Sequence, residues 1–429
     1  MRGVQIRWDG RVMADRRWGR GHAVGLLRGK ESVQQATYVE LFFDLVMVFA
    51  LNRLVAFAAP SVGGGDLAAQ WTAIGRILLL FMPLMWLWII TSYITARFDP
   101  RAAHTQWMIV VTAFALLVMG VTVPHAFGGA GMTFAVAYVL AQVSRAMIFG
   151  YALGRHALAR LYFRALIWFL VAGVFWIGGA LTSGGTQAAW WLAAVLVELG
   201  SAWRGWPVPR LGKERATAWA TAPRHLAERY QQLLLIALGE TILAVGVTYA
   251  TGLGRVGGYQ SIGLLLAFLT TVLLWRIYFH KAGQLLGDAV AHAEDPAGLG
   301  RFAASAHVVM ILGIVATAIG HEIVQTHPVN HSYPTWLIMI LGGPACYLTG
   351  RGALERAVFS RASAHRWIGA LALLLAVVPL TAAPPLAAAI TATVILGGIA
   401  AIDTRRSARR PPEQPRPGDR TTGWLPRRL

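Results

Sequence analysis

Residues 38–54 read YVELFFDLVMVFALNRL and open the first long apolar run of the chain. Such a run is typical of a helix that crosses a lipid bilayer. Yet it contains Glu40 and Asp44, four residues apart, and then Asn52 and Arg53. Polar groups are costly inside hydrocarbon, and those that occur there tend to mark pathways, relays or counter-ions. The stretch therefore predicts a membrane helix with a polar, inward-facing side.

The remainder of the chain has the same apolar character. Of its 429 residues, 56% are hydrophobic and 13% are charged, whereas soluble domains carry about 25% charged residues. A large soluble all-α protein would need polar helix faces, which most of these runs lack. We therefore expect an all-α, polytopic membrane protein with about twelve transmembrane helices, near residues 38–59, 71–96, 106–124, 131–153, 162–182, 187–203, 230–251, 260–281, 302–324, 333–350, 366–382 and 386–402.

The net charge of +19 reflects membrane topology in this interpretation. Basic residues lie in both tails and in alternate loops, with Arg255 as the main exception, so both termini are expected in the cytoplasm. Nucleic acid is not an expected partner, because no groove-reading module accompanies the charge. The expected partners are the lipid bilayer and, for the basic tails, anionic lipids.

The chain divides into a basic tail (1–36), a six-helix unit (37–203), a cytoplasmic linker (204–229), a second six-helix unit (230–402) and a disordered basic tail (403–429). Glu40 and Glu228 are 188 residues apart, and so are Asn52 and Glu240. Because six spans separate the copies, this offset predicts a parallel duplication of a six-helix unit, as seen in transporters. Coincidence among similar apolar strings is the alternative.

Asp44 and Glu240 are the strongest candidates for proton or ion chemistry. Asp44 lies one turn deeper than Glu40 on nearly the same helix face, which suits a proton acceptor or a cation site. Its alternative role is a buried pair with Arg145 of the fourth span. Glu240 lies near mid-span, and Asn52 is its expected hydrogen-bond partner. Glu40 and Glu228 lie near helix starts, where acids also serve as caps.

Other polar groups in the spans are more ambiguous. Glu198 could be neutralised by Arg204, and His307 could be a satisfied core histidine or a proton carrier. His321 and Glu322, with His327 and His331, could form a zinc site, although their spacing is loose. Arg276 and Arg366 can extend to the headgroups. The single cysteine, Cys346, allows no disulfide within the chain.

Four segments carry a family resemblance: VELFFDLVMVFALNRL (39–54), HLAERYQQLLLIALGETIL (225–243), LLWRIYF (273–279) and HVVMILGIVATAIGHE (307–322). They resemble the signature segments of the bacterial low temperature requirement protein A (LtrA) family, over roughly residues 30 to 400. The resemblance implies a polytopic protein of the bacterial inner (plasma) membrane. Its motif positions fall on Glu40, Phe42, Phe43, Asp44, His225, Glu228, Arg229, Gly239, Glu240, His307 and Glu322, with Thr241 where serine is usual and Glu198 where aspartate is frequent.

These observations predict a proton-coupled transporter of an ion or small solute. The expected relay is a single polar core formed by Glu40, Asp44, Asn52, Arg145, Glu198, Glu228, Glu240, His307 and Glu322. An ion channel, a membrane-embedded metal-dependent enzyme and a non-transporting structural protein are the alternatives. No phosphate loop, nucleophile elbow or zinc-protease pattern is found, so neither an enzyme nor a cofactor is expected. A homo-oligomer is possible.

Overall fold

The computed structural model describes residues 35–63, 66–156, 158–213, 222–252, 257–280, 282–361 and 363–408. Within these ranges the chain forms twelve long helices. A 3₁₀ turn, η1 (Val123–His125), follows α4 directly. A short helix, α12 (Pro334–Leu337), and a π segment, η3 (Ile338–Gly342), lead directly into α13. The long helices are α2 (Tyr38–Ser61), α3 (Leu67–Arg97), α4 (Ala103–Thr122), α5 (Gly131–Leu153), α6 (Ala159–Ala180), α7 (Gly184–Trp203), α8 (Pro223–Thr251), α9 (Gly258–Phe279), α11 (Pro296–Thr326), α13 (Gly343–Phe359), α14 (Ala364–Leu380) and α15 (Pro385–Ala408).

The predicted all-α, polytopic membrane architecture is confirmed. Ten helices are long and apolar enough to cross a bilayer, and the part of the chain that is described contains no β-strand. The other two of the twelve predicted spans coincide with α7 and with α14, a shorter apolar helix of 17 residues. Large apolar side chains such as Phe114, Leu140 and Val174 are exposed on the outside of the bundle, as contact with lipid requires.

Several element boundaries differ from the predicted ones, and one helix was not predicted. Helix α8 begins at Pro223, inside the predicted linker, because proline has no N–H to leave unpaired at the first helical position and its fixed φ suits a helix. Helix α15 continues to Ala408, into the predicted tail. A short helix that was not predicted, α10 (Ala282–Ala291), lies between α9 and α11. The predictions for residues 1–34, for 214–221, for Arg255 and for 409–429 lie outside the described residues.

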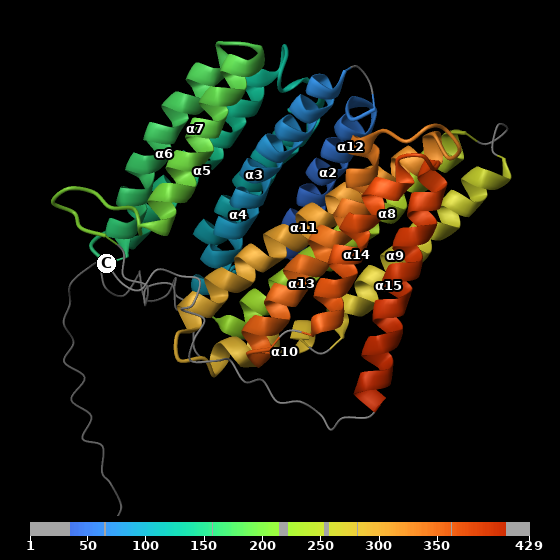
Figure 1. Cartoon of the computed structure of the whole chain (residues 1–429). Helices are drawn as coiled ribbons and strands as arrows, with labels where there is room; N and C mark the ends of the chain where they lie inside the picture. The colour runs from blue at the N-terminus through green and yellow to red at the C-terminus, as the bar shows by residue number, and fades with distance from the viewer. Residues whose placement is uncertain are drawn as a thin grey trace, which may run out of the picture.

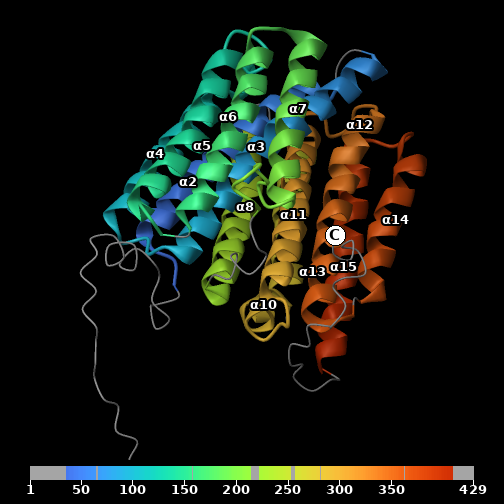
Figure 2. The same cartoon turned by 90° about the vertical axis from the view of Figure 1, so that its left-hand side faces the viewer.

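The long helices run side by side in one bundle (Figure 1). Figure 2 shows α4, α5 and α6 toward one edge and α13, α14 and α15 toward the other, with α3, α8 and α11 between them. Helix α2 packs against α3, α4, α8 and α11, and α8 packs against α2, α9 and α11. The first helices of the two predicted halves, α2 and α8, are therefore in direct contact near the centre of the bundle.

Glycines allow an unusually close approach of α11 and α13. A Cβ atom on Gly313 would lie 2.5 Å from the backbone nitrogen of Tyr347, and one on Gly343 would lie 2.6 Å from that of Thr317. Gly320 meets the backbone of Ile340 in η3, and Gly350 meets the backbone of Ala306 in α11, in the same way. Small residues at such spacing let membrane helices pack backbone to backbone. Of this closely packed pair, α11 is the helix that contacts α8.

Candidate functional site

Two carboxylates of α2 lie at its contact with α8, near the ends at which both helices begin. Glu40 accepts a hydrogen bond from the backbone nitrogen of Thr37 at 2.9 Å, which caps the start of α2. Its Oε1 also lies 3.1 Å from His225 Nε2 and 3.6 Å from Arg229 Nε. Glu40 is therefore a capping acid, as one of the two sequence-based alternatives predicted, and it also contacts His225 and Arg229 of α8.

Asp44 forms a buried ion pair with Arg229. Arg229 Nη1 donates to Asp44 Oδ2 at 2.6 Å and Nη2 donates to Oδ1 at 2.6 Å. Trp88 Nε1 of α3 donates to Oδ1 at 2.8 Å, and the side chains of Asp44 and Arg229 are both 0% exposed. The two-pronged geometry is the strongest form of such a pair. Arg145, suggested by the sequence as the partner of Asp44, takes no part; its place is taken by Arg229.

Aromatic rings extend this cluster toward α11. The guanidinium of Arg229 lies 5.6 Å from the centre of the Trp88 ring, and Trp88 packs on Tyr230, their ring centres 5.4 Å apart. Tyr230 in turn stacks on His307 at 4.4 Å. His307 Nδ1 lies 2.7 Å from the carbonyl oxygen of Ala303, and Nε2 lies 2.8 Å from the Tyr278 hydroxyl. Because a carbonyl only accepts, Nδ1 is the donor to Ala303, while Nε2 faces the Tyr278 hydroxyl, which can donate to a neutral imidazole or accept from a charged one.

A second polar site lies deeper along the same two helices. Asn52 Nδ2 donates a hydrogen bond to Glu240 Oε1, so the predicted hydrogen-bond partner of Glu240 is confirmed. Asn52 is eight residues beyond Asp44, or about 12 Å along α2 at 1.5 Å per residue. The residue Glu240 is 4% exposed, and none of the described cationic side chains lies within ion-pair distance of it. Glu322 of α11 is half-buried and close enough to interact electrostatically with Glu240.

Apolar side chains separate the two sites, so the expected single polar core is wrong. Met47 and Leu51 of α2, with Leu233 and Ala237 of α8, are buried between the level of Asp44 and that of Asn52. The α2–α8 contact therefore holds two distinct sites. We call Glu40, Asp44, His225 and Arg229 the paired cluster, and Asn52 with Glu240 the deep pair.

Glu228 belongs to neither site. It is half-buried, and the hydrogen bond found for it comes from Gln232 on its own helix, at 3.3 Å. His225 and Arg229, one turn apart, face α2 in its place. Three residues from 225 to 228 turn the helix by about 300°, which directs Glu228 to one side of the face that meets α2.

Glu198 and Arg145 form a separate cluster among α5, α6 and α7. Glu198 accepts a short hydrogen bond from Tyr138 and further ones from Gln142 Nε2 at 3.1 Å and Trp176 Nε1 at 3.2 Å. Gln142 connects the two charges, because its Oε1 accepts from Arg145 Nη2. Arg204, the expected counter-ion of Glu198, is exposed at the end of α7, whereas Glu198 is 3% exposed.

A further ion-pair network, which the sequence did not indicate, joins α13, α14 and α15. Arg366 Nε lies 2.8 Å from Glu355 Oε2, and its Nη2 lies 2.9 Å from Asp403 Oδ2. His365 Nε2 lies 2.8 Å from Asp403 Oδ1. Arg366 is 2% exposed and does not extend to the headgroups as expected. The prediction failed because Asp403 was assigned to the disordered tail instead of to α15.

Metal ligands do not gather in the described residues. No group of three or more His, Cys, Asp or Glu side chains in them is placed to hold a metal ion, including the region of His321, Glu322, His327 and His331. Cys346 is a free thiol that donates to the carbonyl oxygen of Val309 at 3.3 Å.

Comparison with known proteins gives one family and one relative. A family model described as "Bacterial low temperature requirement A protein (LtrA)" matches residues 35–401. A protein of Rhizobium meliloti (strain 1021), described as uncharacterized, is 33% identical over 353 residues, which cover 81% of this chain and 84% of that protein. No solved structure matches the chain.

Proposed function

This chain belongs to the bacterial low temperature requirement A family, and on that premise we propose that it is a proton-coupled transporter of an ion or small solute. The proposal places it in the bacterial inner membrane with both termini in the cytoplasm, as the distribution of Lys and Arg favours. The paired cluster then lies toward the cytoplasm and the deep pair nearer the middle of the bilayer.

The main support for the proposal is that the Glu240 carboxyl group is buried without a counter-ion among the described residues. Its carboxyl group is buried well inside a membrane-spanning helix, with Asn52 as hydrogen-bond donor. A carboxylate without a counter-ion is very costly in such a place, whereas a neutral carboxylic acid is tolerated. Binding and release of one proton at Glu240 is therefore tied to whether water or a cation can reach it. That dependence is what couples a proton to a second solute.

The arrangement of helices supports a mechanism of alternating access. In the first half α2 packs on α3 and α4, α4 on α5, α5 on α6, α6 on α7, and α3 on α7. The second half has the corresponding contacts: α8 with α9 and α11, α11 with α13, α13 with α14, α14 with α15, and α9 with α15. These matching neighbours favour a duplicated six-helix unit. Transporters of this kind move one repeat against the other around a site at their interface.

The paired cluster would act as a hinge in this mechanism. Arg229 donates to both oxygens of Asp44, and Glu40 contacts Thr37 and His225, so both carboxyl groups are fixed in position. Helices α2 and α8 would remain joined there while the apolar contact around Met47 and Leu233 opens. Opening would admit water and the solute to the deep pair.

Proton flux in sealed liposomes tests the proposal. Purified protein is reconstituted with a pH-sensitive dye inside, ion gradients and then candidate solutes are imposed, and the wild type is compared with Glu240→Gln. We expect a solute-dependent pH change in the wild type that falls at least tenfold in Glu240→Gln. Glu228→Gln is the matched control, because it changes the same group on the same helix outside both sites.

Full proton flux in Glu240→Gln would exclude Glu240 from the mechanism. Flux of an ion down its gradient, without any pH change and insensitive to Glu240→Gln, would indicate a channel instead.

A further inference from the structure

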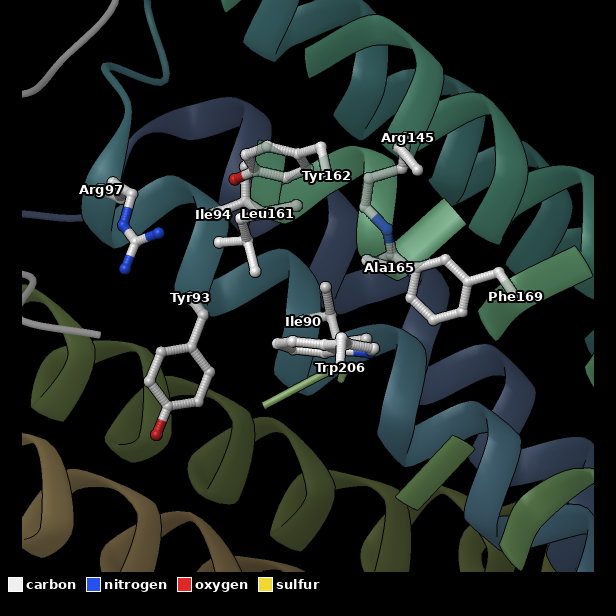
Figure 3. Close-up of a pocket in the computed structure, with 11 residues that line it drawn as sticks. Ile90, Tyr93, Ile94, Arg97, Arg145, Leu161, Tyr162, Ala165, Phe169 and Trp206 are labelled. Carbon is white, nitrogen blue, oxygen red and sulfur yellow. The ribbon is translucent and has the colours of Figure 1, made fainter. Parts of the chain in front are cut away.

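A cavity of about 560 Å³, counting the open space at its mouth, lies away from both sites, among α3, α5, α6 and the turn that follows α7. Aromatic rings line much of it: Tyr93 from α3, Tyr162 and Phe169 from α6, and Trp206 from the turn (Figure 3). Two arginines, Arg97 and Arg145, also line the cavity, and Figure 3 shows Tyr162 between them. None of the described residues that line the cavity is acidic.

Arg145 lines this cavity with a guanidinium group whose hydrogen bonds are only partly made. Its side chain is 1% exposed; Nη1 donates to the Leu87 carbonyl oxygen at 3.3 Å and to Thr91 Oγ1 at 3.2 Å, and Nη2 donates to Gln142. Its Nε has no hydrogen-bond partner. The structure shows no carboxylate of the described residues in ion-pair distance of this guanidinium, since Glu198 is reached only through Gln142. A buried N–H without an acceptor is costly unless a ligand supplies one.

Trp206 is held in the cavity wall at a conformational cost. Its φ of 46° lies in the left-handed region, which is unusual for a bulky residue, and it follows Gly205 at φ 78°. The turn is fastened to α6, because Trp168 Nε1 donates to the Pro207 carbonyl oxygen at 3.0 Å. Trp206 packs there with Leu161 and Phe169 in a small hydrophobic cluster distinct from the main core. Strain of this kind is typical of positions where a side chain must face a ligand.

We propose that this cavity binds an organic anion whose charged group is a carboxylate or phosphate on an aromatic or aliphatic body. The body would pack between Trp206, Phe169 and Tyr162, and the anion would accept a hydrogen bond from Arg145 Nε. Arg97, at the end of α3 and only half-buried, would attract the anion to the mouth. A soluble aromatic acid and the headgroup of an anionic lipid share this chemistry. The inference stands independently of the proton site at Glu240.

The test uses a matched pair of probes on the full-length protein. Binding of 2-naphthoate and of uncharged 2-naphthol is measured by calorimetry, with the protein in lipid nanodiscs of phosphatidylcholine. We expect 2-naphthoate to bind at least tenfold more tightly than 2-naphthol, because only the anion brings a negative charge to the Arg145 guanidinium. Equal binding of the two probes, or no binding of 2-naphthoate, would overturn the proposal.

Two variants locate the site. Arg145→Gln should weaken 2-naphthoate binding at least tenfold and leave 2-naphthol binding unchanged. Because loss of a buried cation can also disturb folding, Ala165→Leu serves as a second variant: it keeps Arg145, fills the apolar part of the cavity and should abolish binding of both probes. Val174→Leu, on the exposed face of the same helix, is its control. Wild-type affinity in Ala165→Leu would place the binding elsewhere and contradict the proposal.

Nanodiscs of different lipid composition distinguish a lipid headgroup from a soluble acid as the natural ligand. Nanodiscs that contain phosphatidylglycerol should lower the apparent affinity for 2-naphthoate at least tenfold if the natural ligand is an anionic lipid headgroup. Unchanged affinity in those nanodiscs identifies a soluble organic acid as the ligand class, and either result supports the site.

Discussion

At one end of the α2–α8 contact a buried carboxyl group is paired with a cation, and at the other end a buried carboxyl group is paired with an amide. Where the helices begin, Asp44 has both oxygens on Arg229 and a further donor in Trp88. About 12 Å deeper, at 1.5 Å per residue, Glu240 has the amide of Asn52 and no cation. The same pair of helices thus contains one acid that is fully neutralised by a counter-ion and one that is not.

This difference separates structural from chemical roles. Loss of one partner strongly destabilises a buried ion pair, because the other charge is left buried without a counter-ion. A carboxyl group held only by an amide can be neutral or, when water enters, charged. We therefore expect changes in the paired cluster to act on folding, and changes in the deep pair to act on function.

The largest effect is expected from removing the cation of the paired cluster. Arg229→Met leaves Asp44 buried without a counter-ion and should lower the free energy of unfolding by about 3–5 kcal/mol. Thermal unfolding and monodispersity in detergent measure this loss. The double variant Asp44→Leu/Arg229→Met, which removes both charges, should recover most of it; a double variant as unstable as Arg229→Met would contradict the assignment.

A smaller effect is expected from the indole donor of the same cluster. Trp88→Phe keeps an aromatic ring beside Tyr230 but removes the hydrogen bond to Asp44 Oδ1. A hydrogen bond to a charged group contributes about 1.5–3 kcal/mol, so a loss near the lower limit is expected because Arg229 remains. Chemical denaturation of the reconstituted protein checks it. Trp86→Phe, two residues away on the same helix, is the control, and an equal loss there would show that the hydrogen bond is not the cause.

The smallest effect on stability is expected in the deep pair. Asn52→Ala removes a hydrogen bond between membrane helices, which is worth about 0.6 kcal/mol on average. Stability should therefore change little. The pH dependence of proton flux should shift, because Asn52 is the hydrogen-bond donor that the structure shows for Glu240. A loss of stability as large as that of Arg229→Met would place Asn52 among the structural groups.

The sequence predicted the helices well, since a bilayer requires long apolar runs and few charged residues. It missed α10, whose ten residues are too short for that signal, and it placed the start of α8 too late. The deep pair could be predicted from the sequence, because Asn52 and Glu240 have the same 188-residue separation as Glu40 and Glu228, and they do form a hydrogen bond.

The partners of the paired cluster required a different spacing. Glu40 meets His225 and Asp44 meets Arg229, and each of these pairs is separated by 185 residues in the sequence. The predicted offset of 188 residues instead matched Glu40 with Glu228. The signal was present: His225 and Arg229 are four residues apart, as are Glu40 and Asp44, so two complementary stripes could be matched. The cluster of Tyr138, Gln142 and Glu198 could not be found in this way, because nothing in the sequence shows which faces of α5 and α7 meet.

One comparison in the same liposomes tests the account most directly: proton flux in Glu240→Gln beside flux in the neutral double variant Asp44→Asn/Arg229→Gln. If Glu240 is the proton site and the paired cluster is structural, Glu240→Gln remains folded and loses flux at least tenfold, while the folded double variant keeps flux within about twofold. Flux that survives in Glu240→Gln and disappears in a folded double variant would contradict the account and move the proton site to Asp44.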